Sequence, residues 1–356
     1  MLAESFLVKS GGHSGVGLGK RERHAVGHTR ILARTGLSRA SAVGQGQVFF
    51  LLMRFLNLHA PGQWLAPFLC VLALWLTPTL SGSQPSSVTF APAVVAVGSP
   101  ELIRVEAVDA AGVDGEWLGR KLEFFRGLDR DHDRRAWFAL AGVDVEAPVG
   151  PSQLKITVRL TQGGLRDLTR TVEIHLAHYR TESLSVAPGF VSPGPEALKQ
   201  IASENELKAK VFAVSAPQPL WAGRFHAPVT APPTDSFGVR RIFNGKLASI
   251  HKGMDFHAAT GTPVHAGNSG VVVLARPLYY EGNCVVIDHG LGLFTLSMHL
   301  SRIDVQEGQR VATGDRLGLS GATGRVTGPH LHWAVRWQGA YLDPAKLLRL
   351  DLSAAH

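Results

Sequence analysis

The sequence predicts a mainly β protein, because two regions of the chain show short apolar runs separated by turns. Apolar residues alternate with polar ones over 154–160 and again over 172–176, with Gly163-Gly164 between the two runs. This period of two is typical of a half-buried β-hairpin. From Ser236 onward, glycines separate short apolar runs. The pattern predicts an N-terminal immunoglobulin-like β-sandwich followed by a Gly-rich antiparallel β domain.

The first 83 residues are predicted to lie outside both domains. Residues 1–52 show no apolar period and are interpreted as an unstructured extension, or as the result of a start codon placed too early. Residues 53–83 have the layout of a secretory signal peptide, with Arg54, an apolar run over 65–76 and small residues at 81–83. That run is shorter than the roughly 20 residues of a membrane-spanning helix. A buried helix or an uncleaved anchor is the alternative.

Net charge gives no support to a nucleic-acid partner. The chain of 356 residues carries a formal charge of +8, of which +6 belongs to residues 1–83. The basic balance is therefore a property of the N-terminal segment and does not indicate a nucleic-acid surface on the folded domains. If the signal peptide with Cys70 is removed, Cys284 is left without an intrachain disulfide partner.

The accessory sandwich is assigned to residues 84–185 and a Pro-rich connector to residues 186–235. Strands are expected at 102–108 and 121–125, and the acidic run 129–133 is interpreted as a solvated turn, because the glycine and glutamate of a calcium loop are missing. A helix is expected at 196–211, with Leu198, Ile201, Leu207 and Val211 on one side. It could pack between the domains or lie across a site as a plug, and packing is the preferred interpretation.

The C-terminal domain, residues 236–350, contains a set of side chains suited to binding zinc. His251 and Asp255 flank Gly253, which permits a tight turn, and His330 and His332 share one face if a strand begins at His330. With His299, these residues suggest a zinc site that keeps one position open. Each motif is weak alone, since histidines are more often surface residues. Their combination in one domain is much stronger.

With these residues in place, the stretch 236–346 resembles the lysostaphin/LytM-type zinc peptidases of peptidoglycan, the M23 family. The matching stretches are Ser236–Arg240, His251–Phe256, Gly261–Val264, Gly282-Asn283, Val286–Gly290, Met298–Ser301, Gly321–Arg325 and Gly328–His332. The resemblance implies a LytM-type fold in which His251, Asp255 and His332 bind Zn²⁺ and His299 and His330 are catalytic. Met298 stands where the family usually has an aromatic residue, and His289 is expected to be structural.

The implied function is an exported zinc endopeptidase that cleaves peptide cross-links of peptidoglycan in the periplasm or cell envelope. A zinc-activated water would attack the amide with acid/base help from a histidine, since no His-Glu-x-x-His motif supplies a glutamate. The expected partners are peptidoglycan peptide stems, with no nucleic acid, no membrane contact beyond the signal or anchor, and a monomeric state. Two alternatives remain: an inactive wall-binding or amidase-activating module, and a lipoyl-type carrier, which would lack its displayed lysine.

Overall fold

The computed structural model describes residues 87–129, 134–184, 193–235, 237–243 and 246–353. The predicted extension at 1–52 and the signal peptide at 53–83 lie outside these residues, as does most of the acidic run at 129–133. Among the described residues, no helix is both long and apolar enough to cross a membrane. Cys284 is buried and forms no disulfide within the part of the chain that the structure describes.

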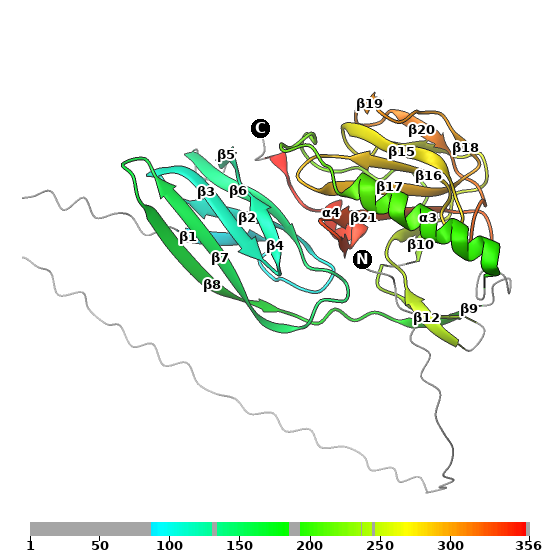
Figure 1. Cartoon of the computed structure of the whole chain (residues 1–356), viewed down its shortest axis with the longest axis horizontal. Coiled ribbons are helices and arrows are strands. Elements are labelled where there is room, and N and C mark those ends of the chain that lie inside the picture. Colours follow the sequence, from blue (N-terminus) through cyan, green and yellow to red (C-terminus); the bar gives the residue numbers. More distant parts are fainter. Residues whose placement is uncertain (1–86, 130–133, 185–192, 236, 244–245, 354–356) are drawn as a thin grey trace, which may run out of the picture. The chain divides into compact units, whose positions relative to one another are not determined.

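Two four-stranded antiparallel sheets occupy the region assigned to the accessory domain (Figure 1). The first contains, in order, β1 (Ser87–Ala91), β2 (Pro100–Glu106), β6 (Arg134–Gly142) and β5 (Phe125–Asp129). The second contains β4 (Arg120–Glu123), β3 (Ala110–Trp117), β7 (Gly150–Leu160) and β8 (Leu165–Ile174). Phe90 of the first sheet meets Trp117 of the second edge to face at 5.8 Å. The predicted hairpin is confirmed as β7–β8, whereas the single strand expected at 121–125 is divided between β4 and β5.

The C-terminal domain is built on an eight-stranded antiparallel sheet. Its strands, in order, are β10 (Pro233–Asp235), β13 (Met254–Phe256), β21 (Leu331–Trp337), β17 (Leu293–Leu300), β16 (Gly282–Asp288), β15 (Gly270–Leu278) and β19 (Arg310–Val311), with β22 (Ala340–Leu342) paired to β21. The mainly β prediction is therefore correct for this domain.

Two small sheets and a short helix complete the domain. One sheet contains β14 (Pro263–His265), β20 (Arg316–Leu319) and β18 (Arg302–Ile303). The other contains β12 (Lys246–Ile250), β11 (Arg240–Phe243) and β9 (Thr181–Leu184), and β9 pairs with β11 in parallel. The helix α4 (Pro344–Leu347) is capped by Asp343, whose side chain accepts a hydrogen bond from Ala345 N.

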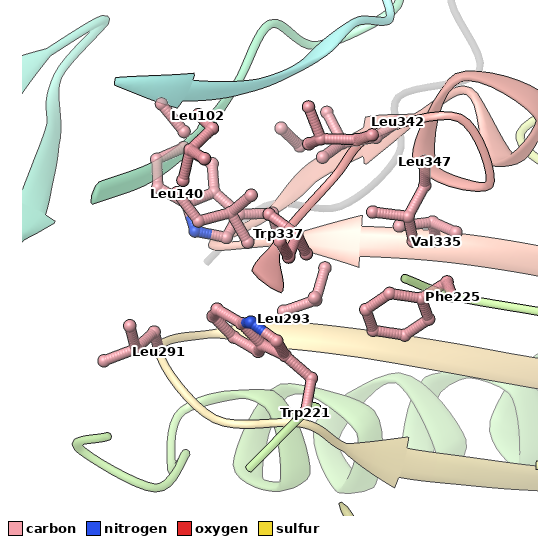
Figure 2. Close-up of a cluster of buried hydrophobic side chains, with 14 of the residues drawn as sticks. Leu102, Leu140, Trp221, Phe225, Leu291, Leu293, Val335, Trp337, Leu342 and Leu347 are labelled. Atoms are coloured by element: carbon pink, nitrogen blue, oxygen red, sulfur yellow. The ribbon is translucent and has the colours of Figure 1, made fainter. Parts of the chain in front are cut away.

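The sequence of β21 explains how the sheet is buried on both faces. Its odd-numbered residues, Leu331, Trp333, Val335 and Trp337, are at most 1% exposed and enter the main apolar cluster. That cluster continues through Leu342 to Leu102 and Leu140 of the first four-stranded sheet (Figure 2). Successive side chains of a strand point to opposite faces. The even-numbered residues, His332 among them, therefore belong to the other face.

The helix expected at 196–211 is α3 (Pro195–Phe212), and it packs on this second face (Figure 1). Phe212 meets Phe294 of β17 at 5.1 Å, and the guanidinium of Arg336 from β21 lies 4.1 Å from the Phe212 ring. Leu207 and Val211 join the same small cluster. Leu198 was expected on one side of the helix with Ile201, Leu207 and Val211, but it is 54% exposed and does not share their packing. The connector helix thus lies on the sheet face to which His332 belongs.

Candidate metal centre

Two strands bring Asp255 and His332 together. In the antiparallel β13–β21 pair these residues are direct partners, and their side chains meet on one face. Asp255 Oδ1 lies 2.7 Å from His332 Nδ1. The alternating pattern of both strands, with apolar neighbours buried in the core, therefore fixes a carboxylate and an imidazole side by side.

His251 completes a group of three donor atoms. Its Nε2 lies 3.1 Å from Asp255 Oδ1 and 2.9 Å from His332 Nδ1. A single N–H on His251 Nε2 cannot form a straight hydrogen bond to both Asp255 Oδ1 and His332 Nδ1. The lone pairs of these atoms therefore point toward a common centre. A tetrahedral zinc with ligand bonds of about 2.0–2.1 Å has edges of about 3.3 Å between donors. The spacing and the donor types, two imidazoles and a carboxylate, fit zinc.

Gly253 matters for a reason other than the one expected from sequence. Gly253 is not one of the described glycines with a positive φ, so its backbone conformation does not require a glycine. A Cβ at this position would instead lie 2.3 Å from His332 Nε2 and 2.8 Å from the carbonyl oxygen of Trp333. The missing side chain therefore makes room for the imidazole of His332.

The protonation states suit a metal ligand set. Burial, the largest influence, raises the pKa of the Asp255 carboxyl, but hydrogen bonds from His251 and His332 and their charges hold that pKa far below its usual range. Burial also lowers the pKa of His332, which favours the neutral ring. Ligation requires an ionised carboxylate and neutral imidazoles. Arg241 donates a hydrogen bond to Asp255 Oδ2 at 2.9 Å, on the oxygen that does not face the histidines.

His299 and His330 lie beside this group. Their ring centroids are 4.9 Å apart, and His299 is 5.9 Å from the ring of His332. His330 Nε2 lies 3.7 Å from Asp255 Oδ1, while its Nδ1 faces the carbonyl oxygen of Gly328 at 2.8 Å. A carbonyl oxygen only accepts, so His330 Nδ1 carries the proton. The structure thus brings all five residues named from the sequence into one site.

Burial gives His299 a different electrostatic setting from a surface histidine. Desolvation, followed by the charges of His332 and His330, lowers the pKa of His299 to about 3. The ring is therefore neutral near pH 7, with one protonated nitrogen and one lone pair. A neutral ring of this kind has a lone pair that can accept a proton or a hydrogen bond.

His289 stands apart from the site, in agreement with its expected structural role. The ring is fully buried, and its Nδ1 lies 2.7 Å from the carbonyl oxygen of Ser269. Nε2 lies 2.8 Å from Thr295 Oγ1. Both nitrogens are used within the fold, so His289 has none left for a ligand.

The fold and this donor set define a β domain with a candidate metal centre. Residues 249–344 match the model of peptidase family M23. This segment of the chain is therefore similar to peptidase family M23.

Named relatives share this domain. It is 48% identical over 114 residues to the peptidoglycan DD-endopeptidase ShyA of Vibrio cholerae serotype O1, covering 32% of this chain and 26% of the relative. It is 41% identical over 98 residues to the DD-carboxypeptidase/endopeptidase Mpg of Neisseria meningitidis serogroup B, covering 28% and 23%. The chain thus spans about a quarter of the length of these relatives.

One solved structure is similar over a larger part of the chain. It is the crystal structure of a candidate peptidase M23 from Pseudomonas aeruginosa, with 28% identity and a TM-score of 0.54. The match covers 73% of this chain and 96% of that one. The structural likeness therefore extends beyond the 96-residue segment of the family model.

Sequence reasoning missed three features of the site. Arg241 was not singled out, although it contacts Asp255. Thr323, whose carbonyl oxygen lies 2.9 Å from His299 Nδ1, was not singled out either. His299 has a left-handed backbone, with φ of 63°. Such a φ is rare for residues other than glycine, so nothing in the sequence indicates it at a histidine.

Proposed function

We propose that this chain is an exported zinc endopeptidase that hydrolyses the D-Ala–diaminopimelate cross-links between peptidoglycan peptide stems. The observation that carries the proposal is the convergence of His251 Nε2, Asp255 Oδ1 and His332 Nδ1 beside two further histidines. The names of ShyA and Mpg, both described as acting on D,D bonds, support the choice of substrate. Export follows from the location of that substrate in the cell envelope.

His251, Asp255 and His332 would hold the metal in this proposal. When bound, zinc supplies a Lewis acid that lowers the pKa of water and polarises a carbonyl. Three protein ligands leave a fourth position open for chemistry. Arg241, on the outer oxygen of Asp255, holds the carboxylate so that Oδ1 is presented to the histidines.

His299 and His330 would move protons. Each has its Nδ1 proton directed at a backbone carbonyl oxygen, that of Thr323 for His299 and that of Gly328 for His330. Each ring therefore keeps its lone pair on Nε2, which is free to accept a proton from water and to return one to the leaving amine. When protonated, either ring can also stabilise the negative charge that develops on the scissile carbonyl oxygen.

The test is digestion of purified cross-linked muropeptide dimers by the zinc-loaded protein, followed by mass spectrometry. We expect each dimer to gain one water and give two monomers, whose masses identify the bond cleaved. Removing zinc with a chelator should stop the reaction, and adding zinc back should restore it. His330→Ala is the matched inactive control, because it keeps the three metal ligands.

Two outcomes would count against the proposal. Intact dimers after incubation with protein shown to contain zinc would contradict the endopeptidase function. If the same protein also sedimented with purified cell walls, the alternative of an inactive wall-binding module would be favoured. Cleavage at a glycine bridge would support the endopeptidase function but contradict the proposed specificity for the D-Ala–diaminopimelate bond.

A further inference from the structure

His299 lies at an irregularity in the sheet. In the β16–β17 pair, Val285 faces Ser297 and Asn283 faces Leu300, so one residue of β16 is opposite two of β17, Met298 and His299. This is the pattern of a β-bulge, which re-aims a side chain and is common beside active sites. His299 is the residue with φ of 63°, and its backbone N–H donates to the carbonyl oxygen of Glu281 at 2.9 Å.

One contact selects the tautomer of this ring. His299 Nδ1 lies 2.9 Å from the carbonyl oxygen of Thr323. That oxygen can only accept, so the proton is on Nδ1 and the lone pair is on Nε2. The direction of the Thr323 carbonyl therefore determines which nitrogen of His299 can act as a base.

The side chain of Thr323 holds that carbonyl in place. Thr323 Oγ1 donates to the carbonyl oxygen of Leu300 at 2.8 Å and accepts from the backbone N–H of Asn283 at 2.9 Å. The hydroxyl thus links the loop that precedes His330 to both strands of the bulge. Asn283 Nδ2 donates to the same Leu300 oxygen at 2.9 Å, which ties the two strands together at this point.

Close backbone contact reinforces the arrangement. A Cβ on Gly282 would lie 2.3 Å from the Thr323 carbonyl oxygen, and one on Gly324 would lie 2.3 Å from Gly282 N. Both glycines have positive φ, of 62° and 76°. The Thr323 carbonyl, which accepts the hydrogen bond from His299, is therefore confined both by the neighbouring backbone and by the hydrogen bonds of the Thr323 hydroxyl.

We infer that Thr323 is a positioning residue for His299. The Thr323 hydroxyl keeps the Thr323 carbonyl aimed at His299 Nδ1 and so keeps the lone pair of that ring on Nε2. The inference rests on the proposed function, because it gives Nε2 of His299 a part in proton transfer. Thr323 touches neither substrate nor metal ligand in this role. It acts only through the ring of His299.

The experiment compares Thr323→Val, which keeps the shape and removes the hydroxyl, with Thr323→Ser, which keeps the hydroxyl. Thr327→Val is the matched control, because Thr327 is exposed in the same loop. We expect Thr323→Val to bind zinc as the parent does, to keep KM within about twofold and to lose kcat by about 10- to 100-fold, the scale expected for a small misplacement of a reacting group. Thr323→Ser should restore kcat, and Thr327→Val should leave it unchanged.

A second readout does not depend on activity. Nitrogen NMR of protein with ¹⁵N-labelled histidine distinguishes a protonated Nδ1 from a protonated Nε2. We expect His299 to show a single Nδ1–H tautomer in the parent and in Thr323→Ser, and a mixture in Thr323→Val. If Thr323→Val does not fold, Thr323→Ala, which removes the hydroxyl and adds no bulk, takes its place in both measurements.

The outcomes separate the inference from the proposed function. Parent kcat in a folded Thr323→Val, or an unchanged Nδ1–H tautomer in it, would overturn the inference, even if the parent cleaves muropeptides. A parent that cleaves nothing would overturn the proposed function, and the NMR comparison would still decide what Thr323 does. Loss of zinc from Thr323→Val would also overturn the inference, because it would indicate a general structural role.

Discussion

Asp255 and His332 are direct partners across the antiparallel β13–β21 pair, with Asp255 Oδ1 2.7 Å from His332 Nδ1. The register of two strands therefore sets the distance between two of the three donor atoms. His251 precedes β13 by a connection of two residues, so its place follows from the same strand. A donor set built on strands is held in position before a metal binds. Removing one donor should therefore mainly lower the affinity for the metal.

We expect His251→Ala and His332→Ala to lose zinc, and His299→Ala and His330→Ala to keep it. Removing an outer partner of a metal ligand costs roughly 10–100-fold in affinity, and removing a ligand should cost at least the upper end of that range. Competition with a chromophoric chelator measures the affinity, and muropeptide turnover should be lost in all four variants. Equal zinc loss in His330→Ala and His332→Ala would contradict the division of roles between them.

Gly253→Ala should weaken zinc binding although residue 253 is no ligand. Its Cβ would lie 2.3 Å from His332 Nε2, so the ring must shift from the position in which its Nδ1 meets Asp255. We expect a loss of zinc affinity of about 10-fold or more, as for other disturbances of ligand orientation. Gly194→Ala is the control, because a Cβ there meets nothing within 4 Å. Unchanged affinity in Gly253→Ala would show that the ring can adjust.

Much of this site was predictable from sequence because strand periodicity is local. The i, i+2 spacing of His330 and His332 predicts a shared face, and both side chains do approach Asp255. The mainly β character and the β7–β8 hairpin follow from alternation in the same way. The boundaries were less accurate: β21 begins at Leu331, and His330 forms an isolated bridge to Gly321.

The features that sequence could not predict depend on pairing between distant segments. The β-bulge at His299 arises from the register of β16 against β17, and no residue pattern marks a histidine for a left-handed backbone. The exposure of Leu198 has a local cause instead: at 3.6 residues per turn it lies on the opposite side of α3 from Leu207. The half-buried stripe of α3 runs instead through Ala197, Ile201 and Glu204 to Leu207.

Folding stability should depend on pH through His289. Burial, its largest influence, lowers the pKa of this histidine from 6.5 to about 4, so the folded state holds it neutral while the unfolded state binds a proton below pH 6.5. Unfolding then takes up a proton between pH 6.5 and 4, and stability falls as pH falls through that window. The shift corresponds to about 3 kcal/mol in total.

The measurement is urea unfolding of the parent and of His289→Gln at pH 7, 6, 5 and 4. We expect His289→Gln to be less stable at pH 7, because it disturbs the contacts with Ser269 and Thr295. Its stability should fall less steeply toward pH 4, since one proton uptake is removed. Parallel curves for the two proteins would contradict a neutral buried His289.

The packing of α3 gives a final matched pair. Phe212 contacts the Phe294 ring at 5.1 Å and lies under the Arg336 guanidinium at 4.1 Å, so Phe212→Ala removes an aromatic pair, a cation–π contact and buried apolar area. For a half-buried ring we expect a loss of about 2 kcal/mol in the free energy of unfolding. Leu198→Ala, at an exposed position of the same helix, should change it by less than about 0.5 kcal/mol. Equal losses in the two variants would contradict a stabilising role for the Phe212 contacts.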